Sequence, residues 1–290
     1  MGKVKKLFGG IDLTWKKLII FAIIAGIYTA LMAMLPIAKD TSFSDLTATF
    51  EMWILFGILI IMNSKSAKDS AFKCFIFFLI SQPLIYLIQD IINGSMLFKT
   101  YYGFWFIWTV GCLPMGFVGY YMKKDKWSGL LILTPILILL GGEYSTYLSK
   151  TMFLFPRHLL TTIFCLVTLI IYPLAIFENK KTKIIGGIIS GVIIVVMSVL
   201  CFMNPPVYST DILLSGENYD FDDTYKAYLN DSKYGDLRIK YEECIASWMV
   251  HAEFKKSGKT EFVLESPNGE KKVFDVTIKM DTYSVKEKNK

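Results

Sequence analysis

The stretch that decides the fold is IIGGIISGVIIVVMSVLCFM, which runs from Ile184 to Met203 without a charged residue. At about 1.5 Å of rise per residue, a helix of this length crosses a hydrocarbon core of about 30 Å. Lysines precede the run, and Asn204, Pro205 and Pro206 follow it. The stretch therefore predicts a final transmembrane helix. The chain before it reads as membrane-embedded, and the chain after it reads as a folded, water-soluble domain.

The composition supports this division. Hydrophobic residues make up 53% of the 290 residues, and the mean hydropathy is +0.45, which is too apolar for an ordinary soluble protein. Residues 1–205 hold 18 basic and 9 acidic side chains, whereas residues 206–290 hold 13 and 16. The basic residues are mostly lysines of short loops. Because nucleic-acid binding needs a basic patch on a soluble face, we exclude that function and predict the lipid bilayer as a partner.

Uncharged runs predict an all-α bundle of about seven transmembrane helices. The predicted segments cover residues 18–38, 46–62, 72–92, 102–122, 127–143, 156–177 and 184–203. The first segment could instead be a signal peptide, but it exceeds the typical apolar run of about 7–15 residues, which favours a retained anchor. Ala22, Gly26 and Ala30 are spaced four apart and predict close helix packing, as do Gly187 and Gly191.

The second segment is unusual because its uninterrupted apolar run, Met52–Met62, is too short to cross a bilayer. A crossing helix of about 17 residues has to begin near Leu46. Glu51 then lies about 7 Å inside the helix end. A charged carboxylate at that depth is costly unless it meets a partner or water.

The lysines predict the orientation of the bundle. Alternate connections place fourteen of them on one side: Lys3, Lys5, Lys6, Lys16, Lys17, Lys65, Lys68, Lys73, Lys123, Lys124, Lys126, Lys180, Lys181 and Lys183. The short loops of the other side hold only Lys39, Lys99 and Lys150. The positive-inside rule makes the first side cytoplasmic, including residues 1–17, and places residues 204–290 outside the cell membrane.

Residues 204–290 change to the two-residue period of β-strands. Trp248, Val250, Ala252 and Phe254 continue one face from Cys244 and Ala246. The turn sequence Ser266-Pro-Asn-Gly269 predicts a hairpin whose second arm buries Phe274, Val276, Ile278 and Met280. Asp222 and Asp223 predict the cap of a short helix over residues 224–229. We expect a small antiparallel β-sandwich, despite a size near the lower limit for one core.

Neither the cysteines nor known motifs point to a chemistry. Cys244 is the one cysteine of the tail, so an internal disulfide is excluded there, which favours a bacterial cell-surface domain. Motifs of phosphate-binding loops, zinc proteases and serine hydrolases are absent, and we predict no cofactor and no metal. A weak calcium candidate is Asn218, Asp220 and Asp222, but Leu229 stands where the bidentate glutamate belongs.

One group of polar residues gathers toward the predicted outer side. It comprises Glu51, Asp90, Glu143, Arg157 and His158, together with Gln82 and Gln89 on one face of the third segment. These residues can form an outward-open pocket, with Arg157 as counter-ion of Glu51 and His158 able to titrate. Alternatively, Asp90, Glu143, Arg157 and His158 only rim the interface, where charged side chains reach water.

Three functions remain compatible with the sequence. The first is a membrane-anchored surface module that binds an extracytoplasmic protein or envelope ligand through residues 206–290. The second is a small-solute transporter or permease that uses the polar residues, although the sequence has no internal repeat. The third is an intramembrane enzyme with Glu51 and His158 as an acid–base pair. We favour the first, and regard an enzyme as the less favoured class.

Overall fold

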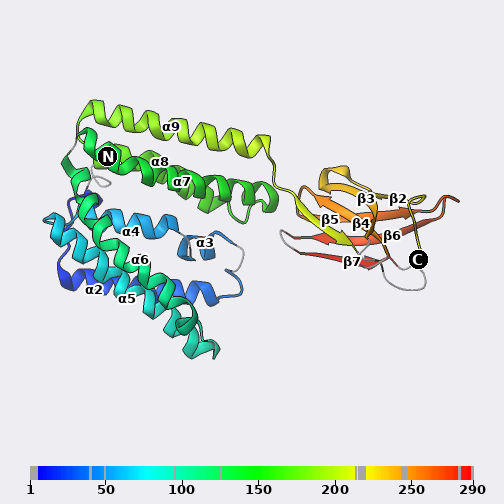
Figure 1. Cartoon of the computed structure of the whole chain (residues 1–290), viewed down its shortest axis with the longest axis horizontal. Helices are drawn as coiled ribbons and strands as arrows, with labels where there is room; N and C mark the ends of the chain where they lie inside the picture. The colour runs from blue at the N-terminus through cyan, green and yellow to red at the C-terminus, as the bar shows by residue number, and fades with distance from the viewer. Residues whose placement is uncertain are drawn as a thin grey trace. The chain divides into compact units, whose positions relative to one another are not determined.

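The computed structural model describes residues 6–38, 41–48, 50–94, 96–124, 126–212, 214, 220–242, 247–279 and 282–288. Within them lie seven helical stretches that are long and apolar enough to cross a membrane, followed by antiparallel β-sheets (Figure 1). This order confirms the predicted sequence of helices and sheet. The chain divides into two compact units, residues 1–147 with 157–199 and residues 148–156 with 200–290. We describe each unit by itself.

The helical unit follows the apolar runs. Its elements are α2 (Trp15–Met34), α3 (Ser42–Ala48), α4 (Phe50–Met62), α5 (Ala67–Asn93), α6 (Leu97–Gly119), the 3₁₀ helix η1 (Tyr120–Lys124), α7 (Trp127–Leu154), α8 (Leu159–Ile176) and α9 (Lys180–Met203). The second apolar stretch, Ser42–Met62, consists of α3 and α4. The helix α7 runs past Glu143 to Leu154, because one carboxylate side chain leaves the backbone hydrogen bonds of a helix intact.

Small residues set the helix contacts. A Cβ at Gly26 of α2 would lie 2.8 Å from the carbonyl oxygen of Ser81 in α5, so the predicted small face is a real contact. On α9 the contact is made by other residues than predicted. A Cβ at Gly186 would lie 2.7 Å from Pro173, whereas Gly187 and Gly191 have no described atom within 4 Å of such a Cβ. The GxxxG pair therefore faces away from the described part of the bundle.

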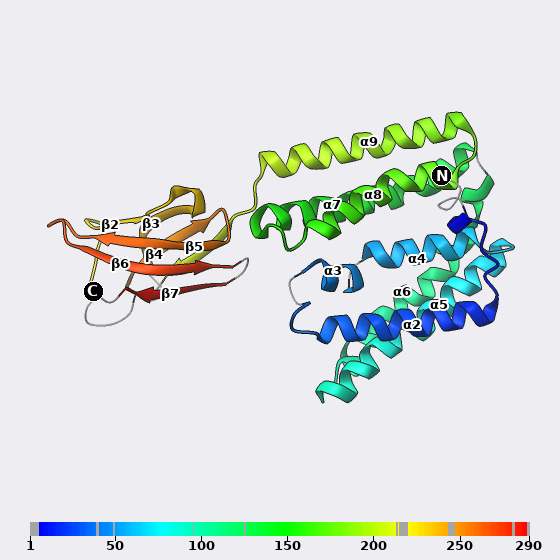
Figure 2. The ribbon, with the colours of Figure 1, turned by 180° about the vertical axis from the view of Figure 1, so that it is seen from behind.

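The strands form two antiparallel sheets. They are β1 (Tyr208–Ile212), β2 (Lys226–Leu229), β3 (Gly235–Glu242), β4 (Ser247–Phe254), β5 (Gly258–Glu265), β6 (Lys271–Ile278) and β7 (Tyr283–Glu287). One sheet has the order β1-β4-β3 and the other β2-β5-β6-β7. Figure 2 labels the strands from β2 to β7. Residues of both sheets share one hydrophobic core, which includes Val250, Phe254, Phe262 and Phe274. A core of large apolar side chains is the main stabilising element of this unit.

The predicted hairpin is confirmed. Strands β5 and β6 pair with Glu265 opposite Lys271, and Gly269 closes the turn by donating to the carbonyl oxygen of Ser266 at 3.0 Å. The φ of Gly269 is +84°, which favours glycine at this position. Its second arm buries Phe274, Val276 and Ile278, as the two-residue period predicts. Met280 lies outside the described residues.

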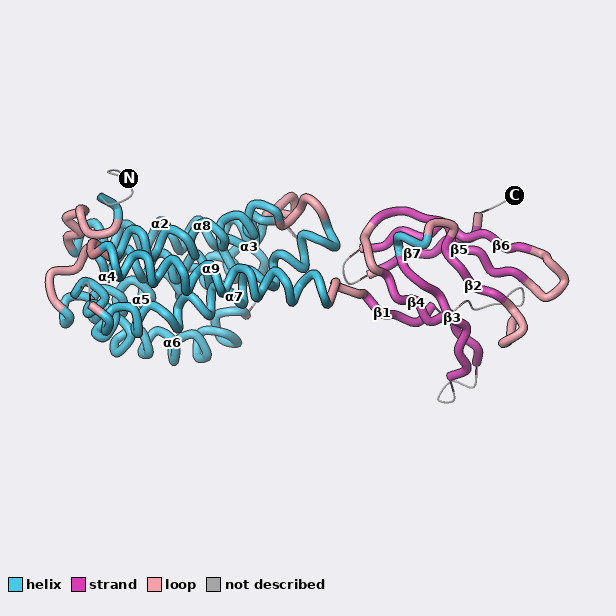
Figure 3. The backbone as a smooth tube through the Cα atoms, turned by 90° about the horizontal axis from the view of Figure 1, so that it is seen from above, coloured by secondary structure: helices cyan, strands magenta, loops and turns pink. Residues whose placement is uncertain are grey.

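The face predicted for the other strand is confirmed as far as the structure describes it. Val250, Ala252 and Phe254 of β4 are buried, and Trp248 packs against the same core. Cys244 and Ala246 lie outside the described residues. Strands β3 and β4 form a hairpin of eight-residue arms (Figure 3).

The helix predicted over residues 224–229 is wrong, because Lys226–Leu229 forms β2 and pairs with β5. Leu229 and Ala227 alternate toward the core, and pairing with β5 satisfies the backbone groups that a short helix would satisfy internally. Asp222 instead forms a local turn, in which its carboxylate accepts a hydrogen bond from the backbone N–H of Thr224 at 2.9 Å.

Candidate functional site

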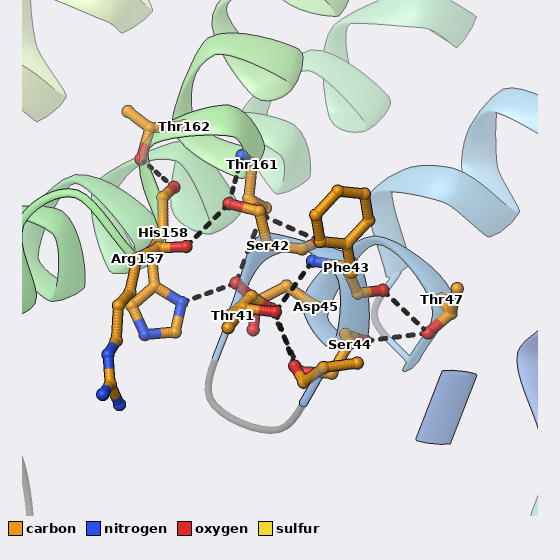
Figure 4. A network of polar contacts seen from close by, with 11 residues as sticks. Thr41, Ser42, Phe43, Ser44, Asp45, Thr47, Arg157, His158, Thr161 and Thr162 are labelled. Atoms are coloured by element: carbon orange, nitrogen blue, oxygen red, sulfur yellow. Dashed lines mark hydrogen bonds and ion pairs between the residues drawn. The ribbon is translucent and has the colours of Figure 1, made fainter. Parts of the chain in front are cut away.

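The N-terminus of α8 is joined to α3 by a buried hydrogen-bond network (Figure 4). The backbone N–H and the hydroxyl of Ser42 both donate to the carbonyl oxygen of Arg157, at 2.9 and 3.0 Å. The Ser42 hydroxyl oxygen in turn accepts from the backbone N–H of Thr161 at 3.1 Å. The first N–H groups of a helix have no partner within the helix, so Ser42 of α3 satisfies a donor of α8. The network explains why a polar segment is held within an apolar bundle.

Asp45 is the charged centre of this network. Its Oδ2 lies 2.6 Å from Nδ1 of His158 and accepts a hydrogen bond from the Thr161 hydroxyl at 3.1 Å. His158 is 3% exposed and Asp45 is 8% exposed. Because an ionised carboxylate can only accept, Nδ1 of His158 carries the shared hydrogen in that state.

Further titratable side chains are buried in the same bundle as the Asp45–His158 pair. Glu51 at the start of α4 is completely buried, as are Cys165 and Tyr172 of α8. The Cys165 thiol interacts electrostatically with the carboxyl groups of Glu51, Glu143 and Asp45, and Tyr172 interacts with Cys165 and Glu51. We define the acid–histidine cluster as Asp45, Glu51, Glu143, His158, Thr161 and Cys165. It gathers residues from α3, α4, α7 and α8 and from the turn before α8.

Three of the predicted site residues, Glu51, Glu143 and His158, belong to this cluster. The predicted pairing of Arg157 with Glu51 stays a prediction. The Arg157 side chain is exposed and points away from Asp45 in Figure 4, while its backbone carbonyl accepts from Ser42. Glu51, by contrast, is buried inside the bundle.

Two of the remaining predicted residues, Asp90 and Gln89, lie where α5 meets α6. The two carboxylate oxygens of Asp90 accept from the backbone N–H groups of Leu97 and Phe98, at 2.7 and 2.9 Å, and so cap α6. Gln82 is buried in α5. Gln89 lines an open groove of about 690 Å³ together with aromatic side chains of both helices. Asp90 is therefore a structural cap.

The calcium candidate gains no support. Asn218 lies outside the described residues, and Asp222 is engaged with Thr224, whose hydrogen bonds lower the pKa of the Asp222 carboxyl group. Across the described ranges, no group of three or more His, Cys, Asp and Glu side chains is placed to hold a metal ion. The Asp220 side chain is exposed to solvent.

Sequence reasoning missed Asp45, Thr161 and Cys165. A signal existed for Thr161, which follows His158 in the first turn of α8 and lies where a polar side chain can reach the helix N-terminus. Asp45 lies one residue before the start predicted for the second segment, so it was counted as part of a loop. These residues could not be assigned to the site because the sequence does not show that α3 lies beside α8.

The acid–histidine cluster places an imidazole and a carboxylate at hydrogen-bond distance inside the bundle. Ionisable groups inside a bundle are costly and mark pathways or binding sites more often than ordinary packing. No family model, curated protein or solved structure matches the chain. The chemistry of the cluster is therefore argued from its own geometry.

Proposed function

We propose that the protein is a multi-pass protein of a bacterial cell membrane that presents a β-sandwich on the outer surface. Residues 206–290 would bind an extracytoplasmic protein or an envelope ligand. The observation that carries this proposal is the distribution of exposed apolar side chains. Among the described residues, large exposed apolar side chains are frequent on the helices, whereas after residue 206 only Val207 and Tyr241 are of this kind.

The distribution matches two different solvents. The outer face of α9 exposes Ile184, Ile188, Val192, Val195 and Val199, which water would not tolerate as a continuous apolar surface. Lipid tails accept such a surface at no cost. The strands instead bury their large apolar side chains in one core and expose charged ones, as expected of a domain surrounded by water.

The orientation is part of the proposal and is supported by the loop lysines. Seven crossings put the two ends of the chain on opposite sides of a membrane. The lysine-rich connections, such as those with Lys65 and Lys123, would be cytoplasmic by the positive-inside rule. The N-terminus then lies inside and the β domain outside.

The sandwich is supported by the shared core of the two sheets. Leu264 and Phe274 from one sheet and Ala252 and Phe254 from the other belong to one cluster of buried residues. The described cysteines all lie in helices, so this core stabilises the domain without a disulfide among them. Such a domain suits a binding role, since its loops and outer strands are free for recognition.

The test compares the full chain with a chain lacking residues 206–290 in intact cells. A tag at Lys290 should be digested by an added protease without lysis, and the shortened chain should still fractionate with the membrane. Cross-linking at the cell surface should capture a protein or envelope polymer on the full chain only. A tag reached only after lysis, or capture that survives the deletion, would refute the surface role.

A second candidate, a small-solute permease, is favoured by the acid–histidine cluster. Transport sites are typically built from ionisable side chains inside a bundle. Uptake into vesicles should fall when Glu51→Ala is introduced, and Glu51→Gln should separate a need for charge from a need for volume. If the wild-type chain moves no solute, or if both variants transport normally, this candidate is rejected.

A further inference from the structure

The lysine-rich end of the helical unit contains a pocket of about 450 Å³. Its lining includes Lys6, Gly9, Met62, Lys123, Ile176 and Glu178. We infer that this pocket binds the phosphate of an anionic phospholipid headgroup. The inference rests on the proposed membrane insertion and goes beyond it, because it assigns a ligand class to a site far along the chain from the β domain.

The pocket is a built feature, because the segment before α2 is fastened over the end of α4. The Asn63 side chain donates to the carbonyl oxygen of Leu7 at 2.7 Å and accepts from the backbone N–H of Ile11 at 2.7 Å. Phe8 is 7% exposed, and its ring centroid lies 6.0 Å from that of Tyr172. These contacts hold Lys6 at the pocket instead of leaving it on a free tail.

Glycines allow the tight turn that forms one wall. The φ of Gly9 is +128°, which a residue with a side chain adopts only with strain. A Cβ at Gly10 would lie 2.9 Å from the carbonyl oxygen of Lys6. Both positions therefore require glycine, and the wall beside Lys6 consists of backbone.

Two lysines supply the charge for an anion. The Lys123 ammonium donates to the carbonyl oxygen of Ser64 at 2.6 Å and lies 4.8 Å from the ring centroid of Tyr120, which fixes its position. An ammonium has three N–H donors, so the bond to Ser64 uses only one of them. Lys6 adds a second positive charge, and Glu178 is the one acidic residue of the lining. The excess is positive, as a phosphate requires.

The apolar part of the lining selects a lipid over a free phosphate. Phe8, Met62, Ala175 and Ile176 lie beside the charged groups, so the pocket offers apolar surface next to a phosphate-binding pair. A phospholipid has this order of groups, with acyl chains adjoining a charged headgroup. Basic pockets between transmembrane helices on the cytoplasmic side are known to favour anionic lipids for this reason.

The test measures lipid binding by the full-length protein in detergent, with phosphatidylglycerol and phosphatidylcholine as probes in native mass spectrometry. We expect tighter binding of phosphatidylglycerol, weakened about tenfold or more by the double substitution Lys6→Gln and Lys123→Gln, since the loss of even one charge-assisted bond is worth about a factor of ten. The matched control is Lys126→Gln with Lys180→Gln. It removes the same charge from exposed lysines that do not line the pocket, and it should change binding less than twofold.

A third variant, Asn63→Ala, keeps both lysines and releases the segment that carries Lys6, so it should also weaken phosphatidylglycerol binding. Equal losses in the pocket variant and its lysine control would overturn the inference in favour of diffuse surface charge. Competition by free glycerol 3-phosphate, with the same dependence on Lys6 and Lys123, would support the phosphate chemistry and assign it to a soluble ligand. Thermal melting confirms that each variant is folded.

The lipid test fails separately from the proposed function. A correctly oriented protein that binds both lipids equally would reject the pocket and leave the surface role intact. A protein that fails the protease test would reject the surface role, and the detergent measurement would still report on the pocket.

Discussion

Each unit of the protein contains one aspartate–histidine pair, and the two pairs differ in their surroundings. The Nδ1–Oδ distance is 2.6 Å for His158 with Asp45 in the bundle and 2.7 Å for His251 with Asp211 in the β unit. The side chains of the first pair are 4% and 10% exposed, whereas those of the second are 30% and 43% exposed. The two pairs have similar geometry but should contribute differently to stability, because water can replace a lost partner at the second pair and not at the first.

The same contrast extends to the way each unit is held together. In the bundle, close contacts involve small residues such as Gly26 and polar bonds such as that of Ser190 to the Leu169 carbonyl. In the β unit, the core consists of large apolar side chains such as Phe254 and Phe262. Lipid offers no hydrophobic drive for helices to associate, so backbone approach and polar bonds take that role. In water, apolar burial is sufficient.

The largest expected effect on stability comes from removing the aspartate of one aspartate–histidine pair. Asp45→Ala should lower the free energy of unfolding of the bundle by about 3–5 kcal/mol, because it leaves His158 and Thr161 buried without their acceptor. Asp211→Ala should lower the stability of the β unit by only about 0–1 kcal/mol. Unfolding of the full chain in mixed micelles, followed by circular dichroism, measures both. Similar losses in the two variants would show that burial does not set the strength of these pairs.

An intermediate effect on stability is expected from replacing glycines, and its sign depends on whether a neighbouring helix lies against the glycine. Gly26→Ala should destabilise the bundle by about 1–3 kcal/mol, since the new methyl group would meet the Ser81 carbonyl. Gly187→Ala should stabilise α9 by up to about 1 kcal/mol, because it meets open space and improves helix propensity. The opposite signs can be read from thermal melting of the two variants in the same detergent. Destabilisation by both would indicate that the Gly187 face is also covered.

The smallest effect concerns an exposed ion pair of the β unit. The hydrogen bond and positive charge of Lys288 lower the pKa of Glu261 below its ordinary value of 4.5. A lowered folded-state pKa adds stability above the ordinary value, and this stability is lost as the pH falls through the folded-state pKa. Glu261→Gln should therefore make the loss of stability below about pH 4.5 slightly shallower. Acid titrations of the wild type and Glu261→Gln, followed by tryptophan fluorescence, measure this slope. Identical slopes would show that the pair of Glu261 and Lys288 does not stabilise the β unit.

Much of the fold could be predicted because it depends on local patterns. Uncharged runs predicted the seven helical stretches, and Ser266–Gly269 predicted the β5–β6 hairpin. The segment of β2 could not be assigned in this way, because Lys226–Leu229 is too short to show a period and takes its structure from β5. The length of α7 was missed because Glu143 looked like a boundary in the sequence.

The site could be predicted only in part. Depth along its helix singled out Glu51, and the predicted topology placed Glu143 and His158 at the same level. Asp45 escaped notice because its partner is 113 residues away and α3 lies outside the apolar run. The capping of α6 by Asp90 could not be predicted from the sequence, because it depends on the turn that follows α5. Long-range pairing and helix capping across turns thus account for the difference between the predicted site and the site in the structure.

The fastening of the N-terminal segment has a consequence for biosynthesis. Residues 7–11 are translated well before Asn63 and Tyr172, which contact Leu7, Ile11 and Phe8. Residues 7–11 therefore cannot complete their contacts until α8 has been made. A fault in the insertion of α4 or α8 would leave this segment undocked.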